Sequence, residues 1–209
     1  MIVLETIITV FLFFLFAASH TFLASRKLKI NLAEKIGDKI AFYRMFYNVS
    51  SLLFLFIFYM LSPKPDVVVY DLHYPFDMLT FALQVLSLFG LIWASMPINI
   101  KEFLGISQIK KYLAGNYNPG DLDEKLTLNT NGAFKFVRHP IYLFLILFLM
   151  FRPTMDLFYL TTLICFIIYF YVGSIYEERK LVEVFGNEYL NYQKNVPRLI
   201  PWVKINSKT

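Results

Sequence analysis

The chain has 209 residues, of which 57% are hydrophobic, 19% aromatic and 17% charged, and its formal net charge is +5. Soluble domains carry about 45–50% apolar and about 25% charged residues, so the composition predicts an all-α integral membrane protein and disfavours a soluble enzyme. The basic residues are confined to certain connections, which indicates membrane topology and not nucleic-acid binding. The length predicts a single domain over 1–209.

Apolar runs predict about five transmembrane helices. The runs cover residues 7–23, 42–61, 79–98, 141–151 and 157–174. The first run lacks the basic flank of a signal peptide, so we expect a retained helix. The fourth run is much shorter than the about 20 residues that a spanning helix needs. Arg152-Pro153-Thr154 separates it from the fifth run, and we expect these last two helices to form a hairpin.

The positions of the Lys and Arg residues predict the orientation of the chain. Of the 20 Lys and Arg residues, only Lys64 and Arg152 lie outside the segments 25–44, 98–140 and 176–209. By the positive-inside rule, the N-terminus is expected outside and the C-terminus in the cytoplasm, where a further C-terminal helix follows the last span. The small size and the lack of a transit peptide favour a prokaryotic inner (plasma) membrane.

Arg138-His139-Pro140 opens the fourth apolar run. Proline is favoured as the first residue of a helix, so His139 is the expected N-cap. The start of a helix offers unpaired N–H groups and partial positive charge, and Arg138 adds a full charge. The motif predicts a site for a carboxylate or phosphate. An Arg-His pair that anchors the helix among lipid headgroups is the alternative.

Glu177 and Glu178 directly follow the fifth apolar run. Acidic residues are rare there, so they predict a cationic partner: a sulfonium, an ammonium, or one of the basic residues Arg179 and Lys180. The alternative is a solvated continuation of the helix. From a rise of about 1.5 Å per residue, the glutamates and His139 are expected roughly 12 Å apart along the hairpin. An extended ligand would then bridge two clusters that do not touch.

His20 lies in the first apolar run, and a histidine in a membrane helix is a functional candidate. A hydrogen bond between helices is the alternative. The single cysteine, Cys165, is expected to be a small buried hydrophobe. No Cys/His cluster has the spacing of a metal site, so no metal is expected. The common nucleotide-binding, hydrolase and zinc-protease motifs are also missing from the sequence.

The motifs R-H-P-x-Y, E-E-x-x-L, F-G-x-x-Y-x-x-Y and V-P-R resemble, in order and spacing, the integral membrane methyltransferases that use S-adenosylmethionine. That superfamily includes isoprenylcysteine carboxyl methyltransferases, phospholipid methyltransferases and methanethiol S-methyltransferases. The match covers about residues 126–202. Further patterns are similar to the methanethiol S-methyltransferase branch, among them S-H-x-x-x-A-S from Ser19, Tyr43-Arg44, Tyr47-Asn48, and Phe103-Leu104-Gly105 with Gln108.

The resemblance implies S-adenosyl-L-methionine as cofactor, with a cofactor-binding part at about residues 100–202. The implied contacts are Leu126, Thr127, Leu128, Phe134, His139, Pro140, Tyr142, Glu177 and Glu178. Family members often carry Tyr where this chain has Phe134. Eukaryotic isoprenylcysteine enzymes carry Arg four residues before the matching glutamate, where this chain has Gly173. This difference favours a small uncharged thiol over a carboxylate acceptor.

The resemblance thus implies methyl transfer to a small or membrane-partitioned thiol at a cytoplasm-facing site. The expected catalytic residues are Arg138 and His139, which hold the cofactor carboxylate, and His20 on the acceptor side. Membrane lipids and a small-molecule or lipid-like acceptor are the expected partners. Two alternatives stay open: a carboxyl or amine methyltransferase acting on an isoprenylcysteine or a phospholipid, and a non-catalytic membrane protein of the same fold.

Overall fold

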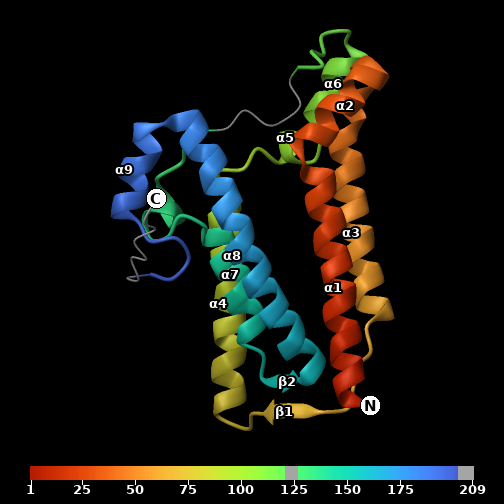
Figure 1. The fold of residues 1–209 in the computed structure, drawn as a ribbon. Coiled ribbons are helices and arrows are strands. Elements are labelled where there is room, and N and C mark those ends of the chain that lie inside the picture. The colour runs from red at the N-terminus through yellow and green to blue at the C-terminus, as the bar shows by residue number, and fades with distance from the viewer. Residues whose placement is uncertain (121–126, 202–209) are drawn as a thin grey trace. The chain divides into compact units, whose positions relative to one another are not determined.

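The computed structural model describes residues 1–120 and 127–201. This part of the chain is mostly helical and divides into two compact units (Figure 1). Unit 1 combines Met1–Pro63 with Ile98–Leu126, and unit 2 combines Lys64–Pro97 with Thr127–Thr209. The high helix content confirms the all-α part of the expected fold class.

Unit 1 is built on two long apolar helices, α1 and α3, which pack against each other (Figure 1). Its elements are α1 (Ile2–Ala24), α2 (Arg26–Ile36), η1 (Gly37–Phe42), α3 (Tyr43–Leu61), α5 (Ile100–Phe103) and α6 (Ile106–Leu113). The basic segment between the first two apolar runs forms α2 and η1, and α6 packs on η1.

The turn between α5 and α6 is fixed to the start of α3 by polar side chains. Arg44 donates from Nε to the Phe103 carbonyl at 2.9 Å, and Asn48 donates to the same carbonyl at 2.7 Å. Gly105 has φ +83°, and a Cβ atom there would lie 2.8 Å from the Met45 backbone nitrogen. Only glycine suits this backbone angle and this close approach. These hydrogen bonds give a structural reason for the sequence patterns Tyr43-Arg44 and Tyr47-Asn48 in unit 1.

Unit 2 contains the apolar hairpin and one more long helix. Its elements are β1 (Val68–Asp71), α4 (Phe76–Ser95), η2 (Gly132–Lys135), α7 (Pro140–Met150), β2 (Thr154–Asp156), α8 (Leu157–Phe185) and α9 (Asn187–Asn195). α7 packs against both α4 and α8, and α9 packs against α8 (Figure 1). The break at Arg152-Pro153-Thr154 leads into β2, which pairs antiparallel with β1.

Helix α7 lies unusually close to α4. A Cβ atom on Gly90 would lie 2.7 Å from Phe144 Cζ and closer still to two other ring carbons, so the ring sits in the space that glycine leaves. The Gln84 side chain also donates to the Phe148 carbonyl at 3.0 Å. These contacts fix α7, and with it the residues that precede it, against a long helix.

Four helical segments of the described residues are long and apolar enough to cross a membrane: Ile2–Ala24, Arg26–Leu61, Phe76–Ser95 and Leu157–Phe185. Their outward side chains are largely apolar, as expected for helices that face lipid. The fourth apolar run forms α7, a shorter apolar helix. The chain therefore has the helices of a membrane protein, and the expected count of five spans stays a prediction.

Candidate functional site

The first part of the site lies where the chain enters α7. His139 is the N-cap residue of this helix and Pro140 is its first residue, as predicted. The His139 side chain does not cap its own helix; it is buried and faces the end of α8. The backbone N–H groups of Arg138 and His139 donate to the carbonyls of Pro197 and Arg198, at 2.9 and 3.1 Å. The chain after α9 is thereby paired with the start of the site.

Glu178 is the centre of the charged cluster. Its side chain is 3% exposed and takes part in five hydrogen bonds. Arg138 donates to both carboxylate oxygens, from Nε at 2.7 Å and from the second guanidinium nitrogen at 3.1 Å. The others involve His139 Nε2 at 3.1 Å, Gln193 Nε2 at 3.0 Å and Arg198 at 2.9 Å. A buried carboxylate needs such complete pairing, because desolvation of an unpaired charge costs several kcal/mol.

The expected separation of roughly 12 Å between the two clusters is therefore wrong. That expectation counted helical rise alone and treated residues 138–139 as the end of a straight rod. In the structure these residues are non-helical and pair with the chain after α9. The long side chains of Arg138 and Glu178 then reach each other directly.

Arg138 is occupied by groups of the protein itself. Besides Glu178, it donates to the carbonyls of Gln193 and Val196, at 2.9 and 2.7 Å. It thus ties together the end of α8, α9 and the segment after α9. Its expected role as a direct ligand of an anion stays a prediction, while its observed contacts are internal.

Glu177 differs from its neighbour, because its side chain is 48% exposed. The Tyr142 hydroxyl donates to Glu177 Oε2 at 3.0 Å, and His139 Nδ1 lies 3.5 Å from the same oxygen. The Tyr142 ring stacks between His139 and Phe170, with ring centroids 5.3 and 4.8 Å apart. An accessible carboxylate is therefore hydrogen-bonded to the middle ring of an aromatic stack.

The electrostatics favour a charged imidazole between the two glutamates. Burial alone lowers the pKa of His139, but the hydrogen bonds and the charges of Glu177 and Glu178 outweigh it and raise this pKa above its ordinary value. On α9, burial raises the pKa of Tyr189 and of Tyr192. Both tyrosines therefore stay neutral hydroxyl groups at physiological pH.

Other predicted contact residues lie on the chain leading into α7. Phe134 is in η2, where its carbonyl accepts from the Tyr192 hydroxyl at 2.6 Å. Thr127 is exposed and Leu128 is half-buried, at the start of the second segment of unit 2. Leu126 lies outside the described residues. Within the described residues, no group of three or more His, Cys, Asp and Glu side chains could hold a metal ion.

His20 belongs to unit 1. The Tyr47 hydroxyl lies 3.0 and 2.9 Å from its two ring nitrogens, and Phe16 packs edge-on against the ring. Tyr43 donates to the Leu23 carbonyl at 2.7 Å. A hydrogen bond between helices, the alternative considered for His20, is thus present between α1 and α3. The structure does not fix the distance between His20 and the cluster in unit 2.

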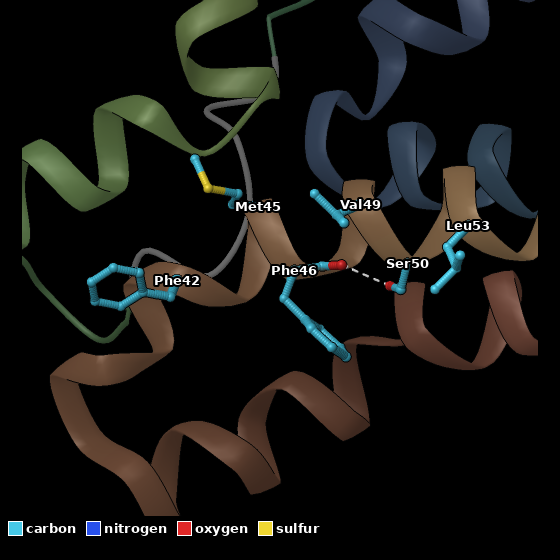
Figure 2. A pocket seen from close by; sticks show the side chains of 6 residues that line it. All are labelled: Phe42, Met45, Phe46, Val49, Ser50 and Leu53. Carbon is cyan, nitrogen blue, oxygen red and sulfur yellow. Dashed lines mark hydrogen bonds between the residues drawn. The ribbon is translucent and has the colours of Figure 1, made fainter.

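Unit 1 also contains an apolar pocket along α3 (Figure 2). Its lining residues are Phe42, Met45, Phe46, Val49, Ser50 and Leu53. Their only hydroxyl, on Ser50, donates to the Phe46 carbonyl at 2.7 Å. None of the six carries a charge, so we assign the candidate site to the charged cluster of unit 2 and not to this pocket.

The sequence reasoning missed two members of the cluster as site residues. Arg198 was noticed only as part of a V-P-R pattern, and Gln193 gave no signal. Each side chain donates to Glu178. The pattern was the one available indication for Arg198, because its partner lies 20 residues earlier in the chain.

Several known proteins are similar to nearly the whole chain. Methanethiol S-methyltransferase 1 of Bradyrhizobium diazoefficiens is 31% identical over 199 residues, which are 94% of this chain and 67% of that protein. The methanethiol S-methyltransferases of Pseudomonas deceptionensis and Crocosphaera subtropica are each 28% identical over 97% of this chain, and over 75% and 77% of their own lengths. No protein-family model and no solved structure matches the chain.

The apolar helices and these relatives define the class: the chain is a membrane enzyme that transfers methyl groups. Within that class, it belongs to the methanethiol S-methyltransferase family. The resemblance inferred from the sequence motifs is thereby confirmed.

Proposed function

We propose that the enzyme transfers a methyl group from S-adenosylmethionine to the sulfur of a small thiol, at the Glu177 end of the α7–α8 hairpin. The observation that carries this proposal is the accessible Glu177 carboxylate beside stacked aromatic rings. Relatives named methanethiol S-methyltransferase support the choice of acceptor.

The chemistry of the side chains fits the cofactor. A sulfonium suits a carboxylate, and Glu177 offers one that the Tyr142 hydroxyl holds in place. A Cβ on Gly173, one turn before Glu177, would meet nothing within 4 Å, so the helix leaves open space there. For the cofactor carboxylate we propose the first turn of α7, which follows His139 and Pro140, with Arg138 contributing its positive charge at longer range.

Further contacts to the cofactor stay as predicted from the sequence. They are Leu126, Thr127, Leu128, Phe134 and Tyr142, and Glu178 acts indirectly by fixing Arg138 and His139. The role of His20 on the acceptor side also stays a prediction.

Catalysis in this proposal depends on alignment and on the exclusion of water. The bound cofactor supplies an electrophilic methyl group. Attack by a thiolate neutralises two opposite charges, so a water-poor site speeds the reaction. Glu177 and Tyr142 orient the ligand, and the rigid cluster around Glu178 keeps their geometry fixed. Such positioning can supply several kcal/mol of rate acceleration.

We propose a cytoplasm-facing site in a five-span protein of a prokaryotic inner membrane, with the N-terminus outside, the C-terminus inside and one functional domain over 1–209. The distribution of Lys and Arg supports the orientation, and the bacterial relatives support the origin. From Leu157 to Glu177, helix α8 rises by about 30 Å, which equals the typical thickness of the hydrocarbon layer. Glu177 then lies at the membrane–water boundary, where a soluble cofactor and an apolar thiol can meet.

A labelling experiment tests the reaction. Purified enzyme in detergent is incubated with methyl-labelled S-adenosylmethionine and one of three acceptors: methanethiol, a prenylated cysteine analogue or phosphatidylethanolamine. We expect label in the volatile sulfide, and a loss of at least tenfold in His139→Ala. Glu183→Gln, which removes an exposed acid from α8, should not cause this loss. Label that appears in the lipid or the prenylated cysteine would reject the thiol in favour of the alternative acceptors.

A further inference from the structure

Two adjacent glutamates have opposite surroundings in this structure. All interactions of Glu178 point into the protein, toward Arg138, His139, Gln193 and Arg198. Both contacts of Glu177 involve Oε2. Within residues 1–120 and 127–201, Glu177 Oε1 takes part in no hydrogen bond or ion pair. One glutamate is thus a fixed part of the protein, and the other can respond to a ligand.

The surroundings of Glu177 suit a small cation. Phe170, Gly173 and Glu177 lie on one face of α8, because residues three, four and seven apart are neighbours on a helix. Tyr142 on α7 contacts this face through its ring stack with Phe170 and its hydrogen bond to Glu177. We call Tyr142, Phe170, Gly173 and Glu177 the Glu177 face. It combines the open space at Gly173 with a carboxylate, whose negative charge attracts cations. The two aromatic rings are stacked on each other, and the Tyr142 hydroxyl holds the carboxylate in place.

We infer that Glu177 discriminates between the charged cofactor and its neutral product. The inference rests on the proposed function and deepens it. Methyl transfer converts the sulfonium of S-adenosylmethionine into the thioether of S-adenosylhomocysteine, and the thiol proton leaves to solvent. The attraction to Glu177 is therefore present before the transfer and absent after it. The Glu177 face retains the substrate form of the cofactor and releases the product.

The neighbouring charges do not cancel this effect. Arg138 and Arg198 are paired with Glu178, on the inner side of the helix. His139 lies between the two glutamates, 3.1 Å from Glu178 and 3.5 Å from Glu177. Because it contacts both acids, its charge offsets part of the attraction that Glu177 exerts on a cation. The contacts of Glu177 with Tyr142 and His139 both use Oε2, so Oε1 remains the negative atom that a ligand meets.

Calorimetry with both cofactor forms tests this inference without any turnover. The wild type should bind S-adenosylmethionine roughly tenfold more tightly than S-adenosylhomocysteine, a size between the attraction of two charges in water and that of a pair near a protein surface. In Glu177→Gln this ratio should fall to about one, because S-adenosylmethionine loses more affinity than S-adenosylhomocysteine. Glu183→Gln serves as matched control and should keep the wild-type ratio. High salt should lower the ratio in the wild type and in Glu183→Gln, but not in Glu177→Gln.

The outcomes separate the two proposals. If the wild type binds both compounds and Glu177→Gln keeps the tenfold ratio, this inference is overturned while the cofactor site stands. If the wild type binds neither compound, the proposed function fails and the inference fails with it. Circular dichroism checks that the variant is folded. If Glu177→Gln does not fold, two other variants replace it. Glu177→Asp keeps the charge and should keep the affinity ratio. Gly173→Leu fills the open space and should reduce the ratio.

Discussion

The contact between Gly90 and Phe144 makes a sharp prediction about the α4–α7 packing that positions the site. Replacing Gly90 by alanine would put a methyl group 2.7 Å from Phe144 Cζ and closer to two further ring carbons. Carbon atoms in contact prefer about 3.5–4.0 Å, so the methyl group would be roughly 1 Å too close to the ring. Either the ring leaves its place between the helices or α7 moves away from α4.

The expected cost follows from two opposing effects. Overpacking of this kind costs about 1–3 kcal/mol. Alanine gains up to about 1 kcal/mol over glycine in helix propensity. We therefore expect Gly90→Ala to lower the free energy of unfolding by about 1–2 kcal/mol, measured by denaturant titration in a mild detergent with circular dichroism as readout. Since α7 carries His139 at its start, cofactor affinity should fall as well.

Gly173→Ala provides the matched control, because it lies inside helix α8 and its new Cβ would meet nothing within 4 Å. It should leave stability unchanged or raise it by up to about 1 kcal/mol. The double variant Gly90→Ala, Phe144→Leu should recover most of the loss. If Gly90→Ala proves as stable as Gly173→Ala, the close packing of α7 on α4 described above is incorrect.

Two further predictions concern the charged cluster. Glu178→Gln leaves buried arginines without their counter-charge and should lower the free energy of unfolding by about 3–5 kcal/mol. Glu183→Gln should change the free energy of unfolding by less than about 0.5 kcal/mol. Equal effects of the two substitutions would contradict the buried cluster. Folding raises the pKa of His139 above the value of about 6.5 for an unfolded histidine. Protonation of His139 therefore stabilises the fold fully below about pH 6.5. This stabilisation disappears as the pH rises through the raised pKa. The unfolding temperature should therefore fall between pH 6 and 9, and less steeply in His139→Asn; identical slopes would refute this assignment.

Apolar runs predicted the long helices because a helix that faces lipid must be apolar along its whole length. The short run 141–151 and the break at Pro153 correctly indicated α7 and its separation from α8. Sequence patterns indicated α2, α5 and α6 less clearly, because these helices lie in segments interpreted as connections. Their polar composition carries no lipid-facing signal, and contacts such as that between Arg44 and the Phe103 carbonyl fix them from far along the chain.

The residues of the site were easier to find than their contacts. Pro140 marked the helix start and Glu177-Glu178 marked an unusual position for acids, both from local sequence. Which glutamate is buried depends on what packs against α8, because consecutive helical residues point about 100° apart. Arg138, 40 residues earlier in the chain, contacts Glu178 and thereby selects it as the buried glutamate. Arg138 reaches Glu178 from a non-helical segment, whose path cannot be calculated from helical rise.

The cluster around Glu178 also sets an order in which the chain can assemble. Its partners come from three stretches: residues 138–139 before α7, Gln193 on α9, and Arg198 after it. During synthesis, a chain that has emerged only through α8 holds this carboxylate with Arg138 and His139 alone. The segment that supplies the last two donors, and the carbonyl groups that complete Arg138, is made afterwards. The cluster that begins at Arg138 therefore becomes complete only when residues 193–198 have been translated.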